Sequence, residues 1–309
     1  MIYKFTEEQK NAIIESWGDD IFLKVSQELE IYSKRWKLSD LEFVEHYSVN
    51  LIFFCKSETY GECVLKIGGN SQDYEFEAEY NVLREYNGWR YIKAYESDID
   101  LAARKKVMLL ERIFPGTVLR DEKSLEKRMI VFSELFNGLF IEPKNPEIYL
   151  SYIEFINNTV DDCLKENADK ENLKILIGHI NRAKELYFEL IKTYDKKMLL
   201  HIDLYWGNIV SGSDGKYKII DPKGVTGDPI FEMGQNLMEE CFKCQRDCEP
   251  DNINLIFAYF EKSLNVPNKI LRQVFYIETV RFVCECNDGI NDGDISRVEF
   301  AEKVMNGNN

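Results

Sequence analysis

The sequence predicts an α+β fold in two lobes, a small N-terminal lobe with a five-stranded antiparallel sheet plus helices and a larger, mainly helical C-terminal lobe. Short runs of aromatic and β-branched residues, bounded by turn residues, occur early in the chain. Longer stretches with apolar residues at the helical period follow them. A chain of 309 residues can also bury more than one core. We expect lobes of residues 1–112 and 113–309.

The N-terminal lobe begins with helices and continues with strands. Thr6 followed by Gln9 is a capping-box pattern that opens a first helix, and residues 19–29 predict a second. Five apolar runs predict the strands of the sheet, over residues 41–47, 50–56, 62–67, 89–95 and 105–111. A helix over residues 74–86, with charged and apolar residues at helical spacing, separates the third run from the fourth.

The remainder of the chain is dominated by helical periodicity. Apolar residues such as Leu173, Leu176 and Ile180 recur at the spacing of one helix face. The same pattern predicts helices over residues 125–140, 147–164, 173–191, 231–246, 252–264 and 269–284. We interpret these stripes as core.

Composition restricts the possible partners. The chain has 39 basic and 54 acidic residues, a formal net charge of −15, which would repel a nucleic-acid backbone and attract a cationic small molecule. It contains no run of the roughly 20 apolar residues that a membrane-spanning helix needs. Its first residues are polar and acidic rather than an apolar signal core. We therefore expect a soluble cytoplasmic protein with neither nucleic acid nor membrane as a partner.

The cysteines allow two interpretations. Eight cysteines without an export signal should be reduced thiols. Cys241, Cys244 and Cys248, with Cys284 and Cys286, could hold a structural zinc ion. The first three also fall on one face of an expected helix, where they would be small buried apolar residues, and we favour this second interpretation.

The most informative motif lies at residues 201–224. Asp203 is followed five residues later by Asn208, and after an apolar strand Asp221 comes thirteen residues beyond that. Phosphoryl transfer uses a carboxylate to accept the hydroxyl proton of the acceptor, and an amide oxygen with a second carboxylate to hold magnesium. The alternative is a surface loop in which these residues only form turns.

A lysine inside an apolar strand is a second candidate. Lys66 lies within the run Cys-Val-Leu-Lys-Ile-Gly, where a charge is costly unless it is paired or exposed at a sheet edge. Glu75 and Glu79, one turn apart in the next expected helix, are possible partners.

The residues of this motif and their spacing resemble those of a known family. His-x-Asp-Leu-x-x-x-Asn at residues 201–208 and Ile-Asp-Pro-Lys-Gly at 220–224 are similar to the catalytic loop and metal-binding Asp of the protein-kinase-like fold. They look most like bacterial aminoglycoside phosphotransferases of the streptomycin and hydroxyurea kinase group. The resemblance implies that Asp203 is the catalytic base and that Asn208 and Asp221 bind Mg²⁺. It also implies ATP or GTP as donor and a hydroxyl of a cationic small molecule, such as an aminoglycoside antibiotic, as acceptor.

The same resemblance implies a nucleotide site in the first lobe. Lys66 would hold the nucleotide phosphates and be oriented by Glu79, whose spacing fits the family better than that of Glu75. Backbone groups near Ser48 and Asn50 are candidates for phosphate contacts. The carbonyl of Glu111 and the amide of Ile113 would bind adenine where the chain leaves the last strand.

The acceptor side is less defined. Residues 227–232 resemble a Gly-Asp-Pro-x-x-Asp run of the family with Glu as the last acid, and the resemblance implies that Asp228 braces the catalytic loop as well as capping a helix. We expect the acceptor to meet an acidic region that contains Glu232, Glu239, Glu240, Asp247, Glu249 and Asp251. The alternatives are the kinase of another small hydroxylated metabolite, a protein kinase, and a catalytically silent nucleotide-binding module. The missing Gly-rich loop argues against a protein kinase.

Overall fold

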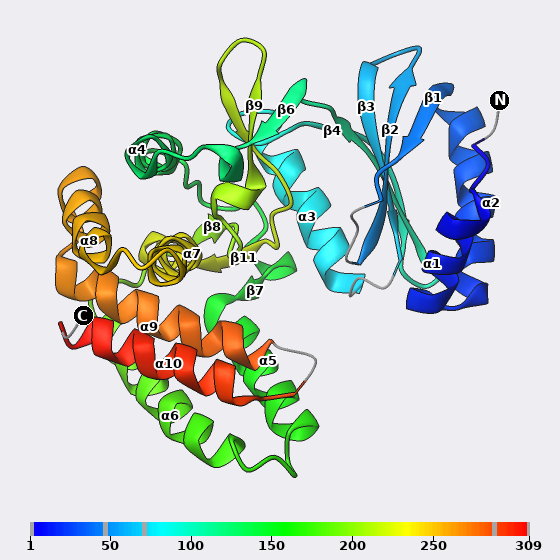
Figure 1. The fold of residues 1–309 in the computed structure, drawn as a ribbon. Coiled ribbons are helices and arrows are strands. Elements are labelled where there is room, and N and C mark those ends of the chain that lie inside the picture. The colour runs from blue at the N-terminus through cyan, green and yellow to red at the C-terminus, as the bar shows by residue number, and fades with distance from the viewer. Residues whose placement is uncertain (1–2, 46–48, 70–72, 286–288, 308–309) are drawn as a thin grey trace. The chain divides into compact units, whose positions relative to one another are not determined.

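The computed structural model describes residues 3–45, 49–69, 73–285 and 289–307 (Figure 1). The chain divides into two compact units. The first comprises Met1–Thr117 and Val210–Ile220, and the second Val118–Ile209 and Asp221–Asn309. The sequence prediction placed a single division at residue 112, so only the structure shows that a later segment returns to the first unit.

The first unit contains the expected five-stranded antiparallel sheet, with the strand order β1-β2-β3-β5-β4. Its strands are β1 (Leu38–Phe43), β2 (Asn50–Ser57), β3 (Gly61–Gly68), β4 (Ala94–Asp100) and β5 (Lys105–Glu111). The helices are α1 (Glu7–Trp17), α2 (Asp19–Arg35) and α3 (Asp73–Tyr86). The capping box that begins α1 is confirmed, because Thr6 and Gln9 each donate a backbone N–H to the other's side chain at 3.1 Å.

The two faces of this sheet have different environments. Successive residues of a strand point to opposite faces. Leu65 of β3 packs in an apolar core with Val25 and Leu29 of α2. Its neighbour Lys66 faces the other way and pairs with Glu79 of α3. The alternation of β3 therefore places the charge of Lys66 on the face of the sheet that α3 covers.

Two strand predictions were displaced. The strand expected at residues 89–95 is β4 and begins only at Ala94, because Asn87, Gly88 and Arg90 have positive φ angles of 45°, 85° and 62° and form a turn. The polar second half of β4 was not predicted. β4 lies at the edge of the sheet, where a strand does not require alternating apolar residues. The strand expected at residues 41–47 begins earlier, as β1, and residues 46–47 lie outside the described part of the chain.

The remaining strands form two small three-stranded sheets. One has the order β10-β9-β6 and consists of β6 (Pro115–Val118), β9 (Ile209–Gly212) and β10 (Tyr217–Ile219). The other has the order β7-β11-β8 and consists of β7 (Leu150–Ser151), β8 (Met198–Leu200) and β11 (Val225–Gly227). β8 and β11 flank the segment that carries the phosphoryl-transfer motif.

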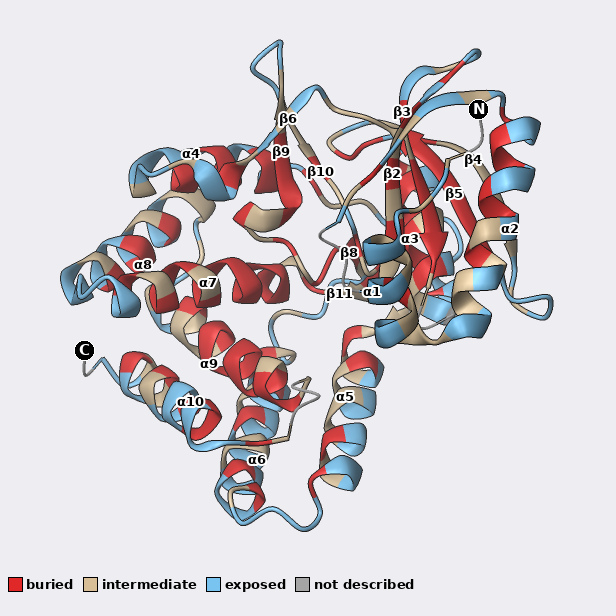
Figure 2. Ribbon diagram, turned by 45° about the vertical axis from the view of Figure 1, so that its right-hand side comes forward, coloured by how far each residue is buried: buried red, intermediate tan, exposed pale blue. Residues whose placement is uncertain are grey.

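The second unit is mainly helical. Its α-helices are α4 (Leu125–Phe136), α5 (Tyr152–Glu166), α6 (Leu173–Leu190), α7 (Met233–Arg246), α8 (Pro250–Leu264), α9 (Asn268–Cys284) and α10 (Asp292–Met305). α9 is buried around most of its circumference and packs against α6, α7 and α10 (Figures 1 and 2). α10 was not predicted, although Asn291 and Asp294 form a capping box that begins it. None of the helices in the described residues combines the length and apolar character needed to span a membrane.

The interpretation of the cysteines as apolar core fits most of the cluster. Cys241 and Cys244 are buried on α7, and Cys284 is buried on α9, whereas Cys248 is exposed. Burial raises the pKa of the Cys244 thiol to about 11, so it stays protonated at neutral pH. Within the described residues no group of three or more His, Cys, Asp or Glu side chains is arranged to hold a metal ion. Cys286 lies outside the described part of the chain.

Candidate functional site

The loop after β8 brings Asp203 and Asn208 together. A 3-10 turn, η3 (Trp206–Asn208), shortens the path between them, and the N–H of Asn208 donates to the carbonyl of Tyr205 at 2.9 Å. The Asn208 amide nitrogen then donates to the Asp203 carbonyl at 2.8 Å and to its carboxylate at 3.0 Å. This leaves the amide oxygen of Asn208 without a protein donor in the described structure. A hard cation prefers such an oxygen as a ligand.

The backbone before Asp203 is in an unusual conformation. Ile202 has φ +67°, a left-handed conformation that is strained for a β-branched residue. The buried carboxylate of Glu232 accepts the backbone N–H of His201 at 2.6 Å and that of Ile202 at 2.9 Å. Burial raises the pKa of Glu232 to about 8, against the lowering effect of these two donors. Glu232 therefore holds the strained turn.

The structure corrects the role expected for Asp228. Its carboxylate accepts the N–H of Ile230 at 3.1 Å and caps the short helix η4 (Pro229–Glu232), as expected. Its other oxygen accepts the N–H of Lys196 at 3.1 Å. The brace of the catalytic loop is the last acid of the run, Glu232, because Glu232 reaches the loop's backbone donors and Asp228 binds elsewhere.

Burial and neighbouring charges set the electrostatics of Asp203. Burial raises the pKa of its carboxyl to about 7, while the positive charges of Lys223 and Arg281 act in the opposite direction. His201 is fully buried, and its Nδ1 accepts the backbone N–H of Asp203 at 3.1 Å. His201 thus supports the loop, in keeping with the absence of a chemical role in the sequence interpretation.

Asp221 lies in the same unit as the loop. It has φ +56°, which Asp tolerates better than most residues, and it is exposed. Two residues later, the N–H of Lys223 donates to the carbonyl of His201 at 3.0 Å and ties this segment to the catalytic loop. Carboxylate and amide oxygens such as those of Asp221 and Asn208 are suitable ligands for Mg²⁺.

Sequence reasoning missed a charged network on α9 beside the loop. The Arg281 guanidinium donates to Glu278 at 3.0 Å and is ion-paired with Glu285, and Lys223 Nζ lies 3.4 Å from the Glu285 carboxylate. The spacing of Glu278, Arg281 and Glu285 places all three on one helix face, so this pairing was detectable in the sequence. The contact of Glu285 with Lys223 joins residues distant in sequence and was not.

In the first unit, Lys66 and Glu79 form a buried ion pair. Lys66 Nζ lies 2.9 Å and 2.7 Å from the two carboxylate oxygens of Glu79, and each residue is 5% exposed. Glu75 is half-buried and contacts Tyr74. The partner of the strand lysine is therefore Glu79, and a bidentate contact of this kind fixes the direction of the amine.

The remaining candidates of the first unit lie at strand ends. Asn50 begins β2 opposite Gly68, and its buried side-chain oxygen has no hydrogen-bond partner in the described residues. Ser48 lies outside the described part of the chain. Glu111 ends β5, and its carboxylate accepts the N–H of Lys93 at 2.9 Å. The N–H of Ile113 has no protein acceptor within the described ranges.

Most of the acidic region expected to meet the acceptor serves internal contacts. Glu240 is buried and forms a bidentate ion pair with Arg128 at 2.6 and 2.7 Å. Asp247 pairs with Lys243 at 2.8 Å, and Glu232 binds the loop. Glu232 and Glu240 are therefore unavailable to a ligand, which the count of charges in the sequence could not reveal, whereas Asp247 is exposed.

The aromatic pair of the catalytic loop is held by Arg120. The guanidinium lies 5.1 Å from the centroid of the Trp206 ring and donates to the Tyr205 hydroxyl at 3.0 Å. The Tyr205 ring folds back over Gly207, where an added Cβ would lie 2.4 Å from it. Only glycine fits there without a shift.

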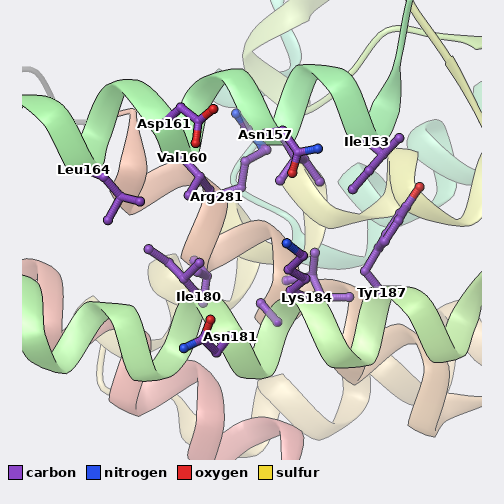
Figure 3. Close-up of a pocket in the computed structure, with 14 residues that line it drawn as sticks. Ile153, Asn157, Val160, Asp161, Leu164, Ile180, Asn181, Lys184, Tyr187 and Arg281 are labelled. Carbon is purple, nitrogen blue, oxygen red and sulfur yellow. The ribbon is translucent and has the colours of Figure 1, made fainter.

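A pocket opens among α5, α6 and α9 (Figure 3). Its walls are mostly apolar, with Asp161 and Lys184 as the charged side chains contributed by α5 and α6. Arg281 of the charged network also lines it, but Asp203, Asn208 and Asp221 do not. The pocket is therefore separate from the phosphoryl-transfer motif.

Comparison with solved structures identifies the class of fold. The chain is similar to the choline kinase LicA of Streptococcus pneumoniae, with TM-score 0.62, 15% identity and 90% and 98% of the two chains covered. An ethanolamine kinase of Plasmodium vivax matches with TM-score 0.66, 12% identity and 99% and 98% covered. The aminoglycoside phosphotransferase APH(4)-Ia matches with TM-score 0.62, 14% identity and 90% and 96% covered. The fold is that of the kinase-like small-molecule phosphotransferases.

The sequence comparison narrows this class to one family. Residues 35–288 match the aminoglycoside/hydroxyurea antibiotic resistance kinase family, and the chain belongs to it. It is 27% identical over 157 residues to streptomycin 6-kinase of Streptomyces griseus, a match that spans 49% of this chain and 47% of that protein. The match therefore spans about half the length of this curated relative.

Proposed function

We propose that this protein transfers the γ-phosphoryl group of a nucleoside triphosphate to a hydroxyl of a small molecule. The observation that carries the proposal is the Asn208 amide, which holds the Asp203 carboxylate at 3.0 Å on a strained loop braced by Glu232. A turn that only reverses the chain needs no buried carboxylate to stabilise a left-handed Ile202. Membership in a kinase family supports the same function.

In this proposal Asp203 orients the acceptor hydroxyl and accepts its proton. Asn208 and Asp221 would hold magnesium through oxygen ligands. When bound, the ion would neutralise charge on the nucleotide phosphates. The conformation of the loop supports this division of roles, since the amide nitrogen of Asn208 binds Asp203 and its oxygen remains for the metal.

The nucleotide would be held mainly by the first unit. Lys66, kept in place by Glu79, would contact the phosphates as a buried cation with a fixed direction. Ser48 and Asn50 are proposed as backbone contacts to the phosphates. Glu111 and Ile113 would offer a carbonyl and an amide to the base. Similar solved structures are complexes with ADP, AMP or AMP-PNP, which supports an adenine nucleotide, with GTP as the alternative.

The acceptor is proposed to be an aminoglycoside-type antibiotic that carries positive charge. The family and the similarity to a streptomycin kinase support this choice, as does the net charge of −15. Within the acidic region, Glu239 is a carboxylate whose pKa is raised by burial, against the smaller lowering effect of the charge of Arg120. Arg120 lies beside Tyr205. We propose the cytoplasm, where nucleoside triphosphates are available, as its location.

A direct test is a screen of aminoglycosides and neutral hydroxylated compounds with ATP or GTP, in which mass spectrometry detects phosphate transfer. We expect magnesium-dependent transfer to a cationic acceptor. Asp221→Ala should abolish metal-dependent nucleotide binding in calorimetry, because it removes a proposed ligand. Asp214→Ala, which alters an exposed carboxylate paired with Lys216, is the matched control. Unchanged affinity in Asp221→Ala would refute the metal assignment, and a neutral best acceptor would refute the aminoglycoside assignment.

A further inference from the structure

The catalytic loop carries no basic residue between Asp203 and Asn208, since the intervening residues are Leu, Tyr, Trp and Gly. Phosphoryl transfer develops negative charge on the oxygens of the transferred group, and preorganised cations stabilise that charge. Lys223 is tied to the loop through its backbone N–H, which donates to the carbonyl of His201 at 3.0 Å, and Lys223 and Arg281 are both paired with Glu285. One of them is a candidate for the cation that stabilises the negative charge of the transferred group.

Arg281 is not available to a ligand at the loop. Its side chain is 3% exposed. Glu278 and Glu285, before and after it on the same helix face, both pair with the guanidinium. Its charge is therefore already compensated by two carboxylates in a buried position, and its role is to fix the end of α9.

Lys223 differs from Arg281 in both its exposure and its pairing. Its side chain is 30% exposed, and among the described residues it contacts one carboxylate, that of Glu285 at 3.4 Å. An ammonium group has three N–H donors, so this contact leaves donors for a ligand. Its backbone N–H is fixed to the carbonyl of His201 at 3.0 Å, two residues before Asp203. The stem passes beside Phe155, whose ring centroid lies 5.7 Å from Nζ.

We propose that Lys223 is a further catalytic residue, whose ammonium group donates to an oxygen of the phosphoryl group during transfer. The inference rests on the proposed function. In the step, a bond forms between the acceptor oxygen and the γ-phosphorus, and the bond from that phosphorus to the bridging oxygen breaks. The leaving nucleoside diphosphate keeps the electron pair, and the hydroxyl proton passes to Asp203. Lys223 exchanges no proton and serves as a fixed charge.

Three variants separate this role from a structural one. Lys223→Met removes the charge and the tether to Glu285. Lys223→Gln removes the charge but keeps an N–H donor for Glu285, and Lys223→Arg keeps both. Lys192→Met is the matched control, because Lys192 forms an exposed lysine–glutamate pair with Glu189 in the same unit. Melting temperatures show which variants fold.

The measurements are kcat, the Kd of the magnesium–nucleotide complex, and the affinity for magnesium–ADP with aluminium fluoride in the presence of the acceptor. Aluminium fluoride mimics the transferred group. We expect Lys223→Gln and Lys223→Met to lose a factor on the order of 10² in kcat and in affinity for the mimic. The Kd of the magnesium–nucleotide complex should change less than about twofold, and Lys223→Arg should recover most of the loss.

Two results would overturn the inference. Wild-type kcat in Lys223→Gln would show that the tether matters and the charge does not. A loss of ground-state nucleotide affinity equal to the loss in kcat would make Lys223 an ordinary phosphate ligand. A wild-type protein without magnesium-dependent phosphate transfer would refute the proposed function itself, and the inference with it.

Discussion

Each unit of the molecule carries one charge that we propose to be functional, and the two units stabilise these charges differently. In the first unit, Lys66 contacts the carboxylate of Glu79 at 2.7 Å. In the second, Asp203 has the amide of Asn208 as its neighbour, and the cations Lys223 and Arg281 act on it through space. One charge is neutralised by direct contact and the other only partly, which agrees with a pKa of about 7 for Asp203.

The difference follows from the backbones that carry the two charges. Lys66 and Glu79 lie on a strand and a helix, whose backbone groups are satisfied by the neighbouring strands β2 and β5 and within α3. Asp203 stands on an irregular turn with a left-handed Ile202, which depends on the distant carboxylate of Glu232. The two members of the ion pair lie on regular elements, whereas the loop depends on Glu232, about thirty residues away in the sequence.

The largest expected effect comes from removing that brace. Glu232→Ala should lower kcat by a factor on the order of 10², because a loop displaced by about 1 Å misplaces Asp203. It should also cost about 2–4 kcal/mol of unfolding free energy, since two N–H donors lose a buried acceptor. Steady-state kinetics and urea unfolding measure the two effects.

Asp228→Ala is the matched control for this prediction, because Asp228 is a buried acid of the same turn that caps η4. It should cost about 0.5–2 kcal/mol, as loss of a cap does, with a much smaller loss of kcat. Equal kcat in the two variants would show that the loop does not need Glu232.

The ion pair of the first unit should respond differently. Lys66→Met leaves Glu79 buried without its cation and should cost about 3–5 kcal/mol of unfolding free energy. The double variant Lys66→Met with Glu79→Leu should recover part of this loss, because two apolar side chains leave no unpaired charge. Urea unfolding of both variants measures the difference. A double variant less stable than Lys66→Met would contradict the comparison.

The comparison also explains how far the sequence could predict the structure. Lys66 was predicted as a charge within an apolar strand, and the resemblance to the family favoured Glu79 over Glu75 as its partner. The strand predicted over residues 89–95 began too early, because the positive φ of Asn87 and Arg90 forms a turn that their residue types do not require. Regular elements were predictable because their periodicity is local.

In the helical unit, the contacts between residues distant in sequence could not be predicted. Asp203 and Asn208 were close in sequence and could be predicted as neighbours. Glu232 was assigned to the acceptor region, and its contact with residues 201–202 depends on the fold of the intervening chain. Glu240 was assigned there too, although it pairs with Arg128, 112 residues away in the sequence. Long-range contacts of carboxylates leave no pattern in one sequence.

A buried carboxylate without a close partner gives a smaller effect that depends on pH. Glu28 of α2 is 7% exposed, and Lys24 lies 3.8 Å away. Burial raises its pKa from 4.5 to about 7, with Lys24 lowering it and Asp98 raising it. The folded state thus keeps a proton that the unfolded chain loses above pH 4.5. The stability from this group is present below pH 4.5 and is lost as the pH rises through 7.

Glu28→Gln removes that dependence. The variant should gain stability relative to the wild type as the pH rises from 4.5 to above 7, by up to about 3 kcal/mol. Urea unfolding at several pH values measures the difference between the two curves. Glu30→Gln, in which a surface carboxylate paired with Lys34 is changed, is the control and should show little pH dependence. Parallel curves for Glu28→Gln and wild type would contradict the assignment.

The central claim is that Asp203 acts in the transfer step and not in nucleotide binding, and the most direct test measures both in one variant. In Asp203→Ala, the Kd of the magnesium–nucleotide complex from calorimetry should stay within about twofold of wild type, while kcat falls by a factor on the order of 10² or more. Near-normal kcat in Asp203→Ala, in a protein that folds and binds nucleotide, would contradict the account.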